Sequence, residues 1–195
     1  AFGCVRECLH RDTGEKYAVK TIDKSKITRF DHIRREIELL HSIDHPCIMK
    51  MVDCYEDADY VHIVTEKYTG GELFDEIMDK TTDDGCLLED QAAKIIKSLL
   101  EAVQYLHSKN IVHRDIKPEN ILLEHKHARC ISSNDIKICD FGQCATGQVD
   151  GIKSLSDLCG SPGFFAPEMI LDGNLYCGIR ADIWSIGCVL LELAL

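Results

Sequence analysis

The sequence predicts an α+β protein of two parts, a small β-rich part followed by a mainly helical one. In the first third of the chain, short runs of alternating apolar residues are separated by turn residues. From Gly70-Gly71 onward, apolar residues recur at helical spacing, most clearly between Glu89 and Lys109. A chain of 195 residues is long enough to bury a sizeable core in one or two compact units.

The first part is expected to form a sheet with one helix. Four segments have strand character: Val5–Leu9, Lys16–Ile22, Ile48–Tyr55 and Tyr60–Glu66. The turn residues Asp12-Thr13-Gly14 indicate a hairpin between the first two strands. The spacing of apolar residues predicts a helix over Asp31–Ser42, which Pro46 helps to end.

The second part is expected to be helical around a few short strands. Leu73, Phe74 and Ile77 predict a short amphipathic helix, and the residues from Glu89 to Lys109 predict a long one. Two further segments have strand character: Ile121–Leu123 and Ile136–Cys139. An apolar helical run then extends from residue 183 to residue 195.

Composition excludes several kinds of protein. The chain has 11 cysteines but no signal peptide before them, which favours reduced thiols and a cytoplasmic location, with the nucleus as the alternative. The net charge of −11 argues against nucleic acid as a partner, and no run is long and apolar enough for a membrane span of roughly 20 residues. Because the chain starts at Ala1 and stops inside an apolar run, we expect a fragment cut at both ends.

Three motifs in a fixed order carry the chemistry. Asp115 follows His113-Arg114, with Lys117 two residues later and Asn120 five residues later. Asp140-Phe141-Gly142 and then Ala166-Pro167-Glu168 follow. Phosphoryl transfer to a hydroxyl needs such an Asp, Lys and Asn, together with a second acidic residue for magnesium. With these motifs, the chain resembles the eukaryotic Ser/Thr protein kinases along essentially its whole length.

The resemblance implies a bilobal protein-kinase-like fold, truncated at both ends, with ATP and Mg²⁺ as cofactors. Its parts would be an N-lobe over residues 1–66, a hinge over residues 67–71 and an incomplete C-lobe over residues 72–195. Asp115 would accept the proton of the substrate hydroxyl, and Lys117 would neutralise charge on the transferred phosphoryl group. Asn120 and Asp140 would be the metal ligands, since both offer the hard oxygens that magnesium prefers.

The resemblance also assigns an ATP site. Lys20 would bind the α- and β-phosphates, and Glu36 would orient the lysine side chain. Taken without Glu36, Lys20 could equally be an ordinary exposed lysine on a strand. Thr65 falls at the gatekeeper position behind the adenine. The residues expected to bind ATP are Phe2, Gly3, Val5, Ala18, Lys20, Thr65, Glu66, Tyr68, Glu72 and Leu122.

Substrate features follow from the same resemblance. Lys117 is typical of Ser/Thr kinases, and the residues expected to bind the substrate are Glu72, Glu119 and Ser161. Glu72 and Glu119 match positions at which kinases bind basic side chains that precede the acceptor residue in the substrate. The alternative is that both are solvated carboxylates with no role in substrate binding. The segment 70–75 and Gly163 resemble the calcium/calmodulin-dependent group, which implies calmodulin or another calcium sensor acting outside this chain.

The activation loop is expected to include Ser154, Ser156 and Asp157. Asp157 stands where relatives carry a phosphorylated Thr, and Arg114 is the residue that such a phosphate would pair with. The rival interpretation is a pseudokinase or nucleotide-binding scaffold, which intact residues at every catalytic position disfavour.

Two structural expectations complete the prediction. Asp182 is expected to cap the helix that follows it and to tie that helix to the catalytic loop. An apolar column is expected to couple the two lobes through Leu40, Met51, His113 and Phe141.

Overall fold

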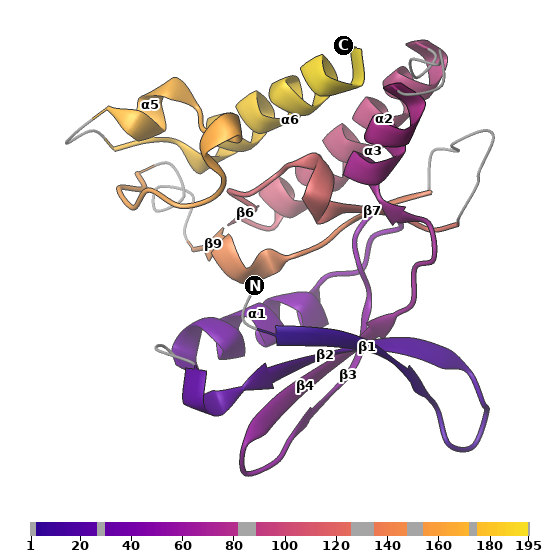
Figure 1. Cartoon of the computed structure of the whole chain (residues 1–195). Coiled ribbons are helices and arrows are strands. Elements are labelled where there is room, and N and C mark those ends of the chain that lie inside the picture. Colours follow the sequence, from indigo (N-terminus) through magenta and orange to yellow (C-terminus); the bar gives the residue numbers. More distant parts are fainter. Residues whose placement is uncertain are drawn as a thin grey trace.

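The computed structural model describes residues 3–26, 30–81, 89–125, 135–147, 154–171 and 175–194, so Phe2 lies outside the described residues. The chain forms two lobes, a small one with the sheet and one helix and a larger, mainly helical one (Figure 1). This arrangement confirms the bilobal α+β fold predicted from the sequence.

The small lobe is built on a four-stranded antiparallel sheet in the order β1-β2-β4-β3. Its strands are β1 (Gly3–Leu9), β2 (Lys16–Asp23), β4 (Tyr60–Glu66) and β3 (Met51–Glu56). The single helix α1 spans Phe30–Ser42, one residue longer than predicted. Ile22, Ile63 and Leu40 are buried in one core cluster, which joins one face of the sheet to α1. A short 3-10 helix, Lys24–Lys26, follows β2.

The third strand begins later than the sequence predicted. Its expected span was Ile48–Tyr55, but β3 starts at Met51, and Ile48 forms an isolated parallel bridge with Ile138 of the large lobe. The amide of Ile138 donates to Cys47 O at 2.9 Å, and the amide of Met49 donates to Ile138 O at 2.9 Å. These bonds occupy backbone groups that would otherwise start the strand, and they tie the two lobes together.

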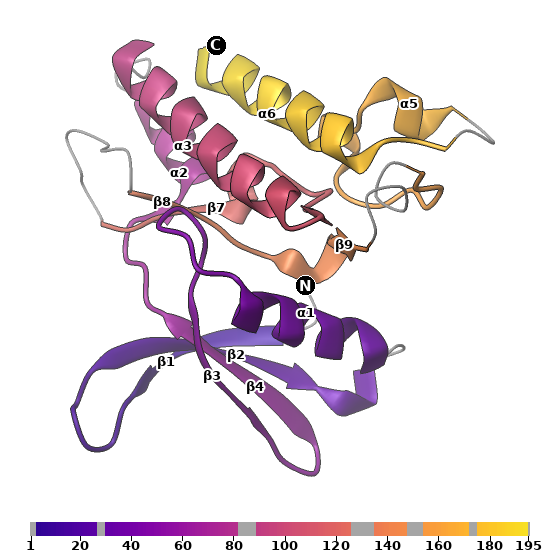
Figure 2. The ribbon, with the colours of Figure 1, turned by 180° about the vertical axis from the view of Figure 1, so that it is seen from behind.

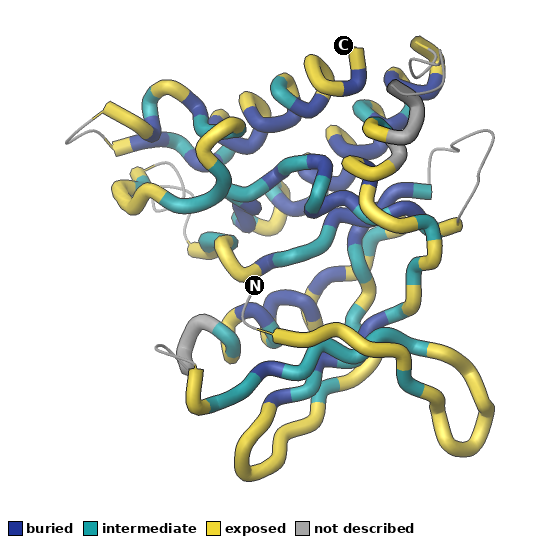
Figure 3. Tube along the Cα trace, in the orientation of Figure 1, coloured by how far each residue is buried: buried dark blue, intermediate teal, exposed yellow. Residues whose placement is uncertain are grey.

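The large lobe contains the long helices of the chain: α2 (Leu73–Thr81), α3 (Glu89–Ser108) and α6 (Gly178–Ala194). Helices α3 and α6 lie side by side, as the views from both sides show (Figures 1 and 2). Helices α3 and α6 both carry buried residues at intervals, and the segments between them and the small lobe are largely buried as well (Figure 3). A short helix, α5 (Pro167–Ile170), precedes α6.

Short strands and turns lie between the long helices and the small lobe. One three-stranded sheet has the order β5-β7-β8, and a two-stranded sheet pairs β6 with β9. The strands are β5 (Gly71–Glu72), β6 (Ile111–Val112), β7 (Ile121–Leu123), β8 (Ile136–Ile138) and β9 (Ala145–Thr146). Three 3-10 helices accompany them: Pro118–Asn120, Phe141–Gln143 and Pro162–Phe164.

The prediction that Asp182 caps the last helix is wrong, because α6 begins at Gly178 and Asp182 lies inside it. Its fully buried carboxylate instead accepts hydrogen bonds from the backbone amides of His113 at 2.9 Å and Arg114 at 2.8 Å. Among the described residues, these two amides of the loop that follows β6 (Ile111–Val112) have no backbone partner, and an unpaired buried N–H is costly. The expected tie between the helix and the loop is therefore confirmed.

Gly178 allows this close packing. A Cβ at this position would lie 2.8 Å from a methyl carbon of Val112 and 2.9 Å from one of Leu155. Any larger residue would push α6 away from β6 and from the loop that Asp182 holds.

The apolar column also forms. Leu40 and Phe141 are buried in the same cluster, and Met51 packs against it. The rings of His113 and Phe141 meet edge to face with 5.0 Å between their centroids. Within the described part of the chain, no helix is long and apolar enough to cross a membrane.

Candidate active site

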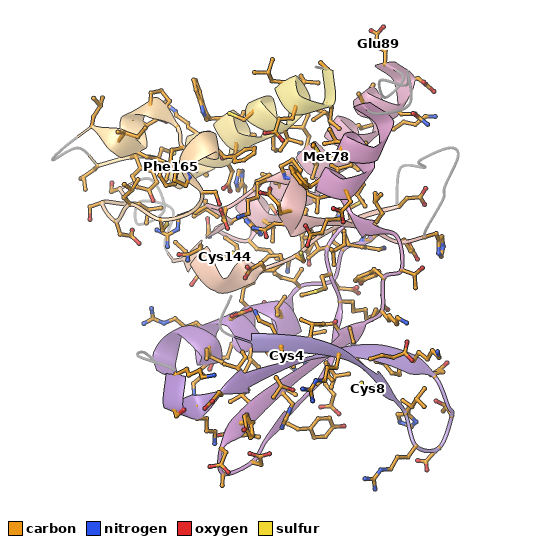
Figure 4. The ribbon with its side chains drawn as sticks, viewed as in Figure 1. Cys4, Cys8, Met78, Glu89, Cys144 and Phe165 are labelled. Atoms are coloured by element: carbon orange, nitrogen blue, oxygen red, sulfur yellow. The ribbon has the colours of Figure 1, made fainter. Side chains whose placement is uncertain are left out.

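The candidate site lies where the two lobes face each other. Figure 4 shows Cys4 and Cys8 along β1 of the small lobe, and Cys144 on the part of the large lobe that faces it. Cys144 directly follows the 3-10 turn Phe141–Gln143, which packs against α1. The motif residues predicted from the sequence come from both sides of this junction.

The catalytic loop connects β6 to β7 and holds Asp115 in a fixed orientation. The amide nitrogen of Asn120 donates to Asp115 O at 2.8 Å and to Asp115 Oδ2 at 2.9 Å. The 3-10 turn Pro118–Asn120 brings Asn120 back toward Asp115, five residues earlier. The carboxylate is thus anchored through one oxygen, which leaves the other, Oδ1, available to a hydroxyl.

A hydroxyl already occupies that position. Ser161 Oγ donates to Asp115 Oδ1 at 2.8 Å, and Lys117 Nζ donates to Ser161 Oγ at 2.7 Å. The segment carrying Ser161 is held in turn by Ser185 of α6, whose hydroxyl donates to Phe164 O at 2.9 Å. The geometry therefore presents an alcohol to a carboxylate and an ammonium group at the same time.

Asp140 has an unusual backbone conformation. Its φ is 58°, in the left-handed region, and its carboxylate accepts a hydrogen bond from the amide of Gly142 at 3.4 Å. Strained non-glycine residues of this kind cluster at functional sites. Asp140 also lies close to Asn120 in the fold, because the amide of Cys139 donates to Asn120 O at 2.9 Å.

Asn120 and Asp140 fit a magnesium ion by the chemistry of their free donors. The amide nitrogen of Asn120 is used by Asp115, and its Oδ1 has no hydrogen-bond partner among the described residues. An amide oxygen and a carboxylate are hard ligands of the kind that Mg²⁺ takes from proteins.

Lys20 and Glu36 form an ion pair between β2 and α1. Lys20 Nζ lies 3.1 Å from Glu36 Oε1, with 26% of the lysine side chain and 9% of the glutamate side chain exposed. Burial by itself would lower the pKa of Lys20, but the charges of Glu36 and Asp140 raise it above its usual value. The lysine is therefore kept as a cation beside Asp140, as a phosphate ligand requires.

The expected adenine-binding residues line the end of the sheet next to the hinge. Ala18 pairs with Thr65 across β2 and β4, and Val5 pairs with Lys20 across β1 and β2. Thr65 is buried, whereas Val5 is exposed. From the large lobe, Glu72 of β5 pairs with Leu122 of β7.

The second half of the hinge backbone, from Thr69 onward, is bonded to the large lobe. The amide of Thr69 donates to Glu124 O at 3.1 Å, and that of Gly70 donates to Leu123 O at 2.9 Å. A Cβ on Gly70 would lie 2.4 Å from the Cβ of Leu123, so only glycine allows this approach. Among the described residues, the backbone amide and carbonyl of Tyr68 have no hydrogen-bond partner.

Carboxylates gather beside the catalytic loop. Burial, with smaller contributions from the charges of Asp75 and Glu119, raises the pKa of Glu72. Glu119 Oε2 is buried and has no hydrogen-bond partner in the part of the chain that the structure describes. A buried carboxylate oxygen without a partner is unfavourable until a hydrogen-bond donor or a cation meets it.

Glu192 belongs to this group and was missed by the sequence analysis. Burial and the charge of Glu119 raise the pKa of Glu192, which places this α6 residue near the catalytic loop. One signal was available, since Glu192 is the only charged residue in the apolar run 183–195.

In the activation loop, Arg114 Nη1 lies 2.8 Å from Asp157 Oδ1, and Arg114 Nε donates to Gln143 O at 2.7 Å. The hydroxyl of Tyr176 donates to Asp157 O at 3.0 Å, which holds this part of the loop. The Arg114 side chain is 9% exposed and that of Asp157 is 63% exposed. Ser154 and Ser156 are exposed nearby.

The whole chain, residues 1–195, matches the family described as protein kinase domain. It is 42% identical over 97% of its length to the probable serine/threonine-protein kinase fhkD of Dictyostelium discoideum, of which it covers 26%. It is 39% identical over 98% of its length to CBL-interacting serine/threonine-protein kinase 26 of Arabidopsis thaliana, of which it covers 42%. It is 40% identical over 97% of its length to calcium-dependent protein kinase 4 of Plasmodium falciparum, of which it covers 34%.

The chain thus spans less than half the length of each of these relatives. All three are named as protein kinases, and the family match extends over every residue of the chain. By its sequence as well as its two-lobed fold, this chain belongs to the protein kinase domain family.

Proposed function

We propose that this chain catalyses ATP- and Mg²⁺-dependent phosphorylation of Ser or Thr residues in protein substrates. The observation that carries the proposal is the alcohol of Ser161, which is bonded to both Asp115 and Lys117. A substrate hydroxyl that entered next to this pair would meet the same carboxylate and the same ammonium group. The relatives named serine/threonine-protein kinases support the same acceptor chemistry.

The catalytic residues have distinct roles in this proposal. Asp115 orients the acceptor hydroxyl and takes its proton while the acceptor oxygen bonds to the γ-phosphorus. The bond from the γ-phosphorus to the bridging oxygen of ADP breaks, and Lys117 balances the charge on the transferred group. Asn120 and Asp140 would hold Mg²⁺, which neutralises phosphate charge when it is bound.

The nucleotide is proposed to bind between an N-lobe of residues 1–66 and a C-lobe of residues 72–195, against a hinge of residues 67–71. Lys20, oriented by Glu36, would bind the α- and β-phosphates. The backbone of Glu66 and Tyr68 would bind the adenine edge, a proposal that the unpartnered amide and carbonyl of Tyr68 support.

The acceptor preference is tested with three peptides that differ only in the acceptor residue: Ser, Thr or Tyr. The intact protein is expected to phosphorylate the Ser and Thr peptides, with kcat/KM for the Tyr peptide at least about a hundredfold lower, which is about 2.7 kcal/mol. Comparable rates on the Tyr peptide would contradict the assignment of Lys117 and Ser161 to a Ser/Thr site.

We further propose that the substrates carry basic residues upstream of the acceptor. Glu72, Glu119 and Glu192 provide carboxylates beside the catalytic loop. Partial burial and neighbouring negative charges raise the pKa of Glu72 and of Glu192, and one oxygen of Glu119 is buried and unpaired among the described residues. An arginine side chain can meet a carboxylate with two parallel, directional hydrogen bonds. A merely solvated carboxylate would not leave an oxygen buried without a partner, so Glu119 Oε2 favours the basic-motif proposal over that alternative.

Replacing Glu72 with Gln is expected to raise KM for an Arg-containing peptide about three- to tenfold, since one charge-assisted contact is lost at a partly exposed site. KM for the same peptide with Ala in place of Arg should not change. The exposed Glu89 at the start of α3 provides the matched control, Glu89→Gln. The ratio of KM for the Ala peptide to KM for the Arg peptide is compared between the two proteins. The same ratio in wild type and in Glu72→Gln would contradict the basic-motif proposal.

The same carboxylate predicts a pH dependence. Because the pKa of Glu72 is raised, its charge is lost at a higher pH than that of an ordinary glutamate as the solution is acidified. KM for the Arg peptide should therefore rise as pH falls below neutrality, and the rise should be smaller in Glu72→Gln. An identical pH profile in the two proteins would exclude Glu72 as the titrating group.

For the activation loop, we propose that Asp157 supplies a built-in negative charge in place of a phosphate. A carboxylate offers one charge and two oxygens, against about −1.5 to −2 and three oxygens for a phosphate. The ion pair with Arg114 is partly exposed on the Asp157 side, and such pairs contribute only ~0.2–1 kcal/mol. The protein would thus have basal activity without phosphorylation, with Ser154 and Ser156 as further points of control.

Asp157→Asn is expected to lower the kcat of the unphosphorylated intact protein by about two- to fivefold. Asp157→Thr should lose the same activity and recover it only after an upstream kinase has phosphorylated the new threonine. Asp59→Asn, in an exposed turn of the small lobe, serves as the control. Unchanged kcat in Asp157→Asn would leave Asp157 without a regulatory role.

Calcium sensing is proposed as a mode of regulation that acts through parts of the protein outside this chain. The proposal rests on relatives whose names describe them as calcium-dependent or CBL-interacting. A calcium dependence of the intact protein's activity would support it.

A further inference from the structure

The side chain of Tyr68 is half-buried, and its hydroxyl has two hydrogen-bond partners. The backbone amide of Lys50 donates to the Tyr68 hydroxyl at 3.1 Å, and that hydroxyl lies 3.1 Å from Glu66 Oε2, to which it donates. Burial raises the pKa of Tyr68, so the phenol keeps its proton and remains a donor at neutral pH.

These contacts close a small ring of hydrogen bonds. The backbone amide of Glu66 donates to Lys50 O at 3.1 Å, so Lys50 is bonded to the hinge through both its amide and its carbonyl. The end of β4, the hinge residue Tyr68 and the segment before β3 are therefore held together at one point. The phenol hydroxyl connects all three, through the amide of Lys50 and the carboxylate of Glu66.

The segment held by Tyr68 is hydrogen-bonded to β8, the strand that leads to the proposed metal ligand Asp140. Met49 donates to Ile138 O at 2.9 Å, one residue from Lys50, and Ile138 ends β8 two residues before Asp140. A shift of Lys50 would thus be transmitted to β8 through adjacent backbone hydrogen bonds.

A second contact links the Tyr68 ring to the same strand. Lys137 Nζ lies 5.7 Å from the centroid of the ring, within the range of a cation–π interaction. The same ammonium group donates to Pro46 O at 2.5 Å and pairs with Glu124 Oε2 at 3.3 Å. Glu124 O in turn accepts the amide of Thr69, the residue after Tyr68. The Tyr68 ring and the next hinge residue are therefore both linked to Lys137 of β8, the ring directly and Thr69 through Glu124.

We propose that the Tyr68 phenol is a positioning group for ATP, which holds the hinge backbone in register with the strand leading to Asp140. Tyr68 would contribute to nucleotide affinity in two ways. Its backbone would bind adenine, and its side chain, without touching the nucleotide, would fix where that backbone stands. The inference rests on the adenine contact proposed above and adds to it a role for a side chain that the contact itself does not require.

Tyr68→Phe tests the inference because it removes only the hydroxyl and keeps the ring beside Lys137. The change leaves the amide of Lys50 and the carboxylate of Glu66 without their partner. KM for ATP and the dissociation constant for ATP are expected to rise about three- to tenfold, because the hinge loses the two hydrogen bonds that fix its position. The kcat and the KM for the peptide should stay within about twofold of wild type.

Tyr55→Phe is the matched control. Tyr55 is exposed on β3, and its hydroxyl donates to Asp53 Oδ2 at 2.6 Å, so this variant also removes a tyrosine–carboxylate hydrogen bond from the small-lobe sheet. Tyr55 lies away from the hinge, so the Tyr55→Phe variant is expected to leave KM for ATP unchanged. Titration calorimetry with ATP and steady-state kinetics on the intact protein provide the two readouts.

The outcomes separate this inference from the proposed function. If the wild-type protein binds ATP and Tyr68→Phe binds it within twofold of wild type, the positioning role is wrong and the kinase proposal stands. If kcat, KM for ATP and KM for the peptide all worsen together with the melting temperature, Tyr68 has only a structural role. If the wild-type protein fails to bind ATP, both proposals fall.

Discussion

Replacing Lys20 with Met or Asp140 with Asn is expected to lower kcat/KM for phosphoryl transfer at least about a hundredfold, which is ~2.7 kcal/mol of transition-state stabilisation. Lys20 is held as a cation by Glu36 at 3.1 Å, and Asp140 stands near both that pair and Asn120. Each side chain acts on charge that develops on the phosphates or is carried by the metal. The loss should therefore be felt mainly in the transition state rather than in folding.

Matched controls distinguish these roles from general effects of charge. Lys16→Met removes an exposed lysine from the same strand β2, and Asp12→Asn removes a carboxylate from the hairpin turn. Both controls should keep wild-type kcat/KM, and all four variants should melt within a few degrees of wild type. If Lys20→Met or Asp140→Asn kept more than roughly a tenth of wild-type kcat/KM, a loss of under about 1.4 kcal/mol, its assignment would be wrong.

Asp182→Ala is expected to produce the largest loss of stability, about 3 kcal/mol in the free energy of unfolding. The carboxylate is fully buried and accepts the amides of His113 and Arg114, and His107 Nε2 lies 2.8 Å from Asp182 Oδ2. Removing it leaves two buried amide donors unpaired in the catalytic loop, each of which costs about 1–3 kcal/mol. The activity should fall as well, because Arg114 directly precedes Asp115.

Denaturant unfolding of the intact protein measures this effect. Asp182→Asn keeps the size of the side chain and one acceptor oxygen, so its loss of stability should be smaller than that of Asp182→Ala. Asp90→Asn, an exposed carboxylate at the start of α3, is the control and should change the unfolding free energy by less than about 0.5 kcal/mol. A loss below 1 kcal/mol in Asp182→Ala would show that water or nearby groups satisfy the loop amides without Asp182.

Local patterns in the sequence were sufficient for most of the fold. The hairpin β1–β2 and the helix α3 were predicted to within a residue or two, because alternation and helical periodicity each depend on neighbours in the chain. The start of β3 was not predictable in this way. Its position depends on backbone bonds between residues 47–49 and Ile138, almost 90 residues later.

The same distinction applies to Asp182. An aspartate close to the start of an apolar helical run indicates a cap, but α6 starts four residues earlier, at Gly178, which packs against Val112 and Leu155. The tertiary partners of the carboxylate lie about 70 residues before it in the chain. No local pattern contains that information.

In the candidate site, motif spacing indicated the residues of the catalytic loop, since Asp115 and Asn120 are only five residues apart. The position of Ser161 came from the resemblance to kinases, and its contacts with Asp115 and Lys117 became visible only in the fold. Glu192 and the phenol of Tyr68 carried no motif. Their surroundings are assembled from distant segments, so burial and partners were needed to single them out.

The central property proposed for this chain, transfer of the γ-phosphoryl group of ATP to a Ser or Thr hydroxyl, is tested most directly by one measurement. The intact protein is incubated with Mg²⁺, γ-labelled ATP and an Arg-containing peptide with a single Ser, while ATP binding is followed by calorimetry. Label should enter the Ser peptide but not its Ala counterpart, and it should fall to background in Asp140→Asn or after magnesium is chelated. Clear ATP binding with no label transferred above the Asp140→Asn background would contradict the proposal and identify a nucleotide-binding scaffold.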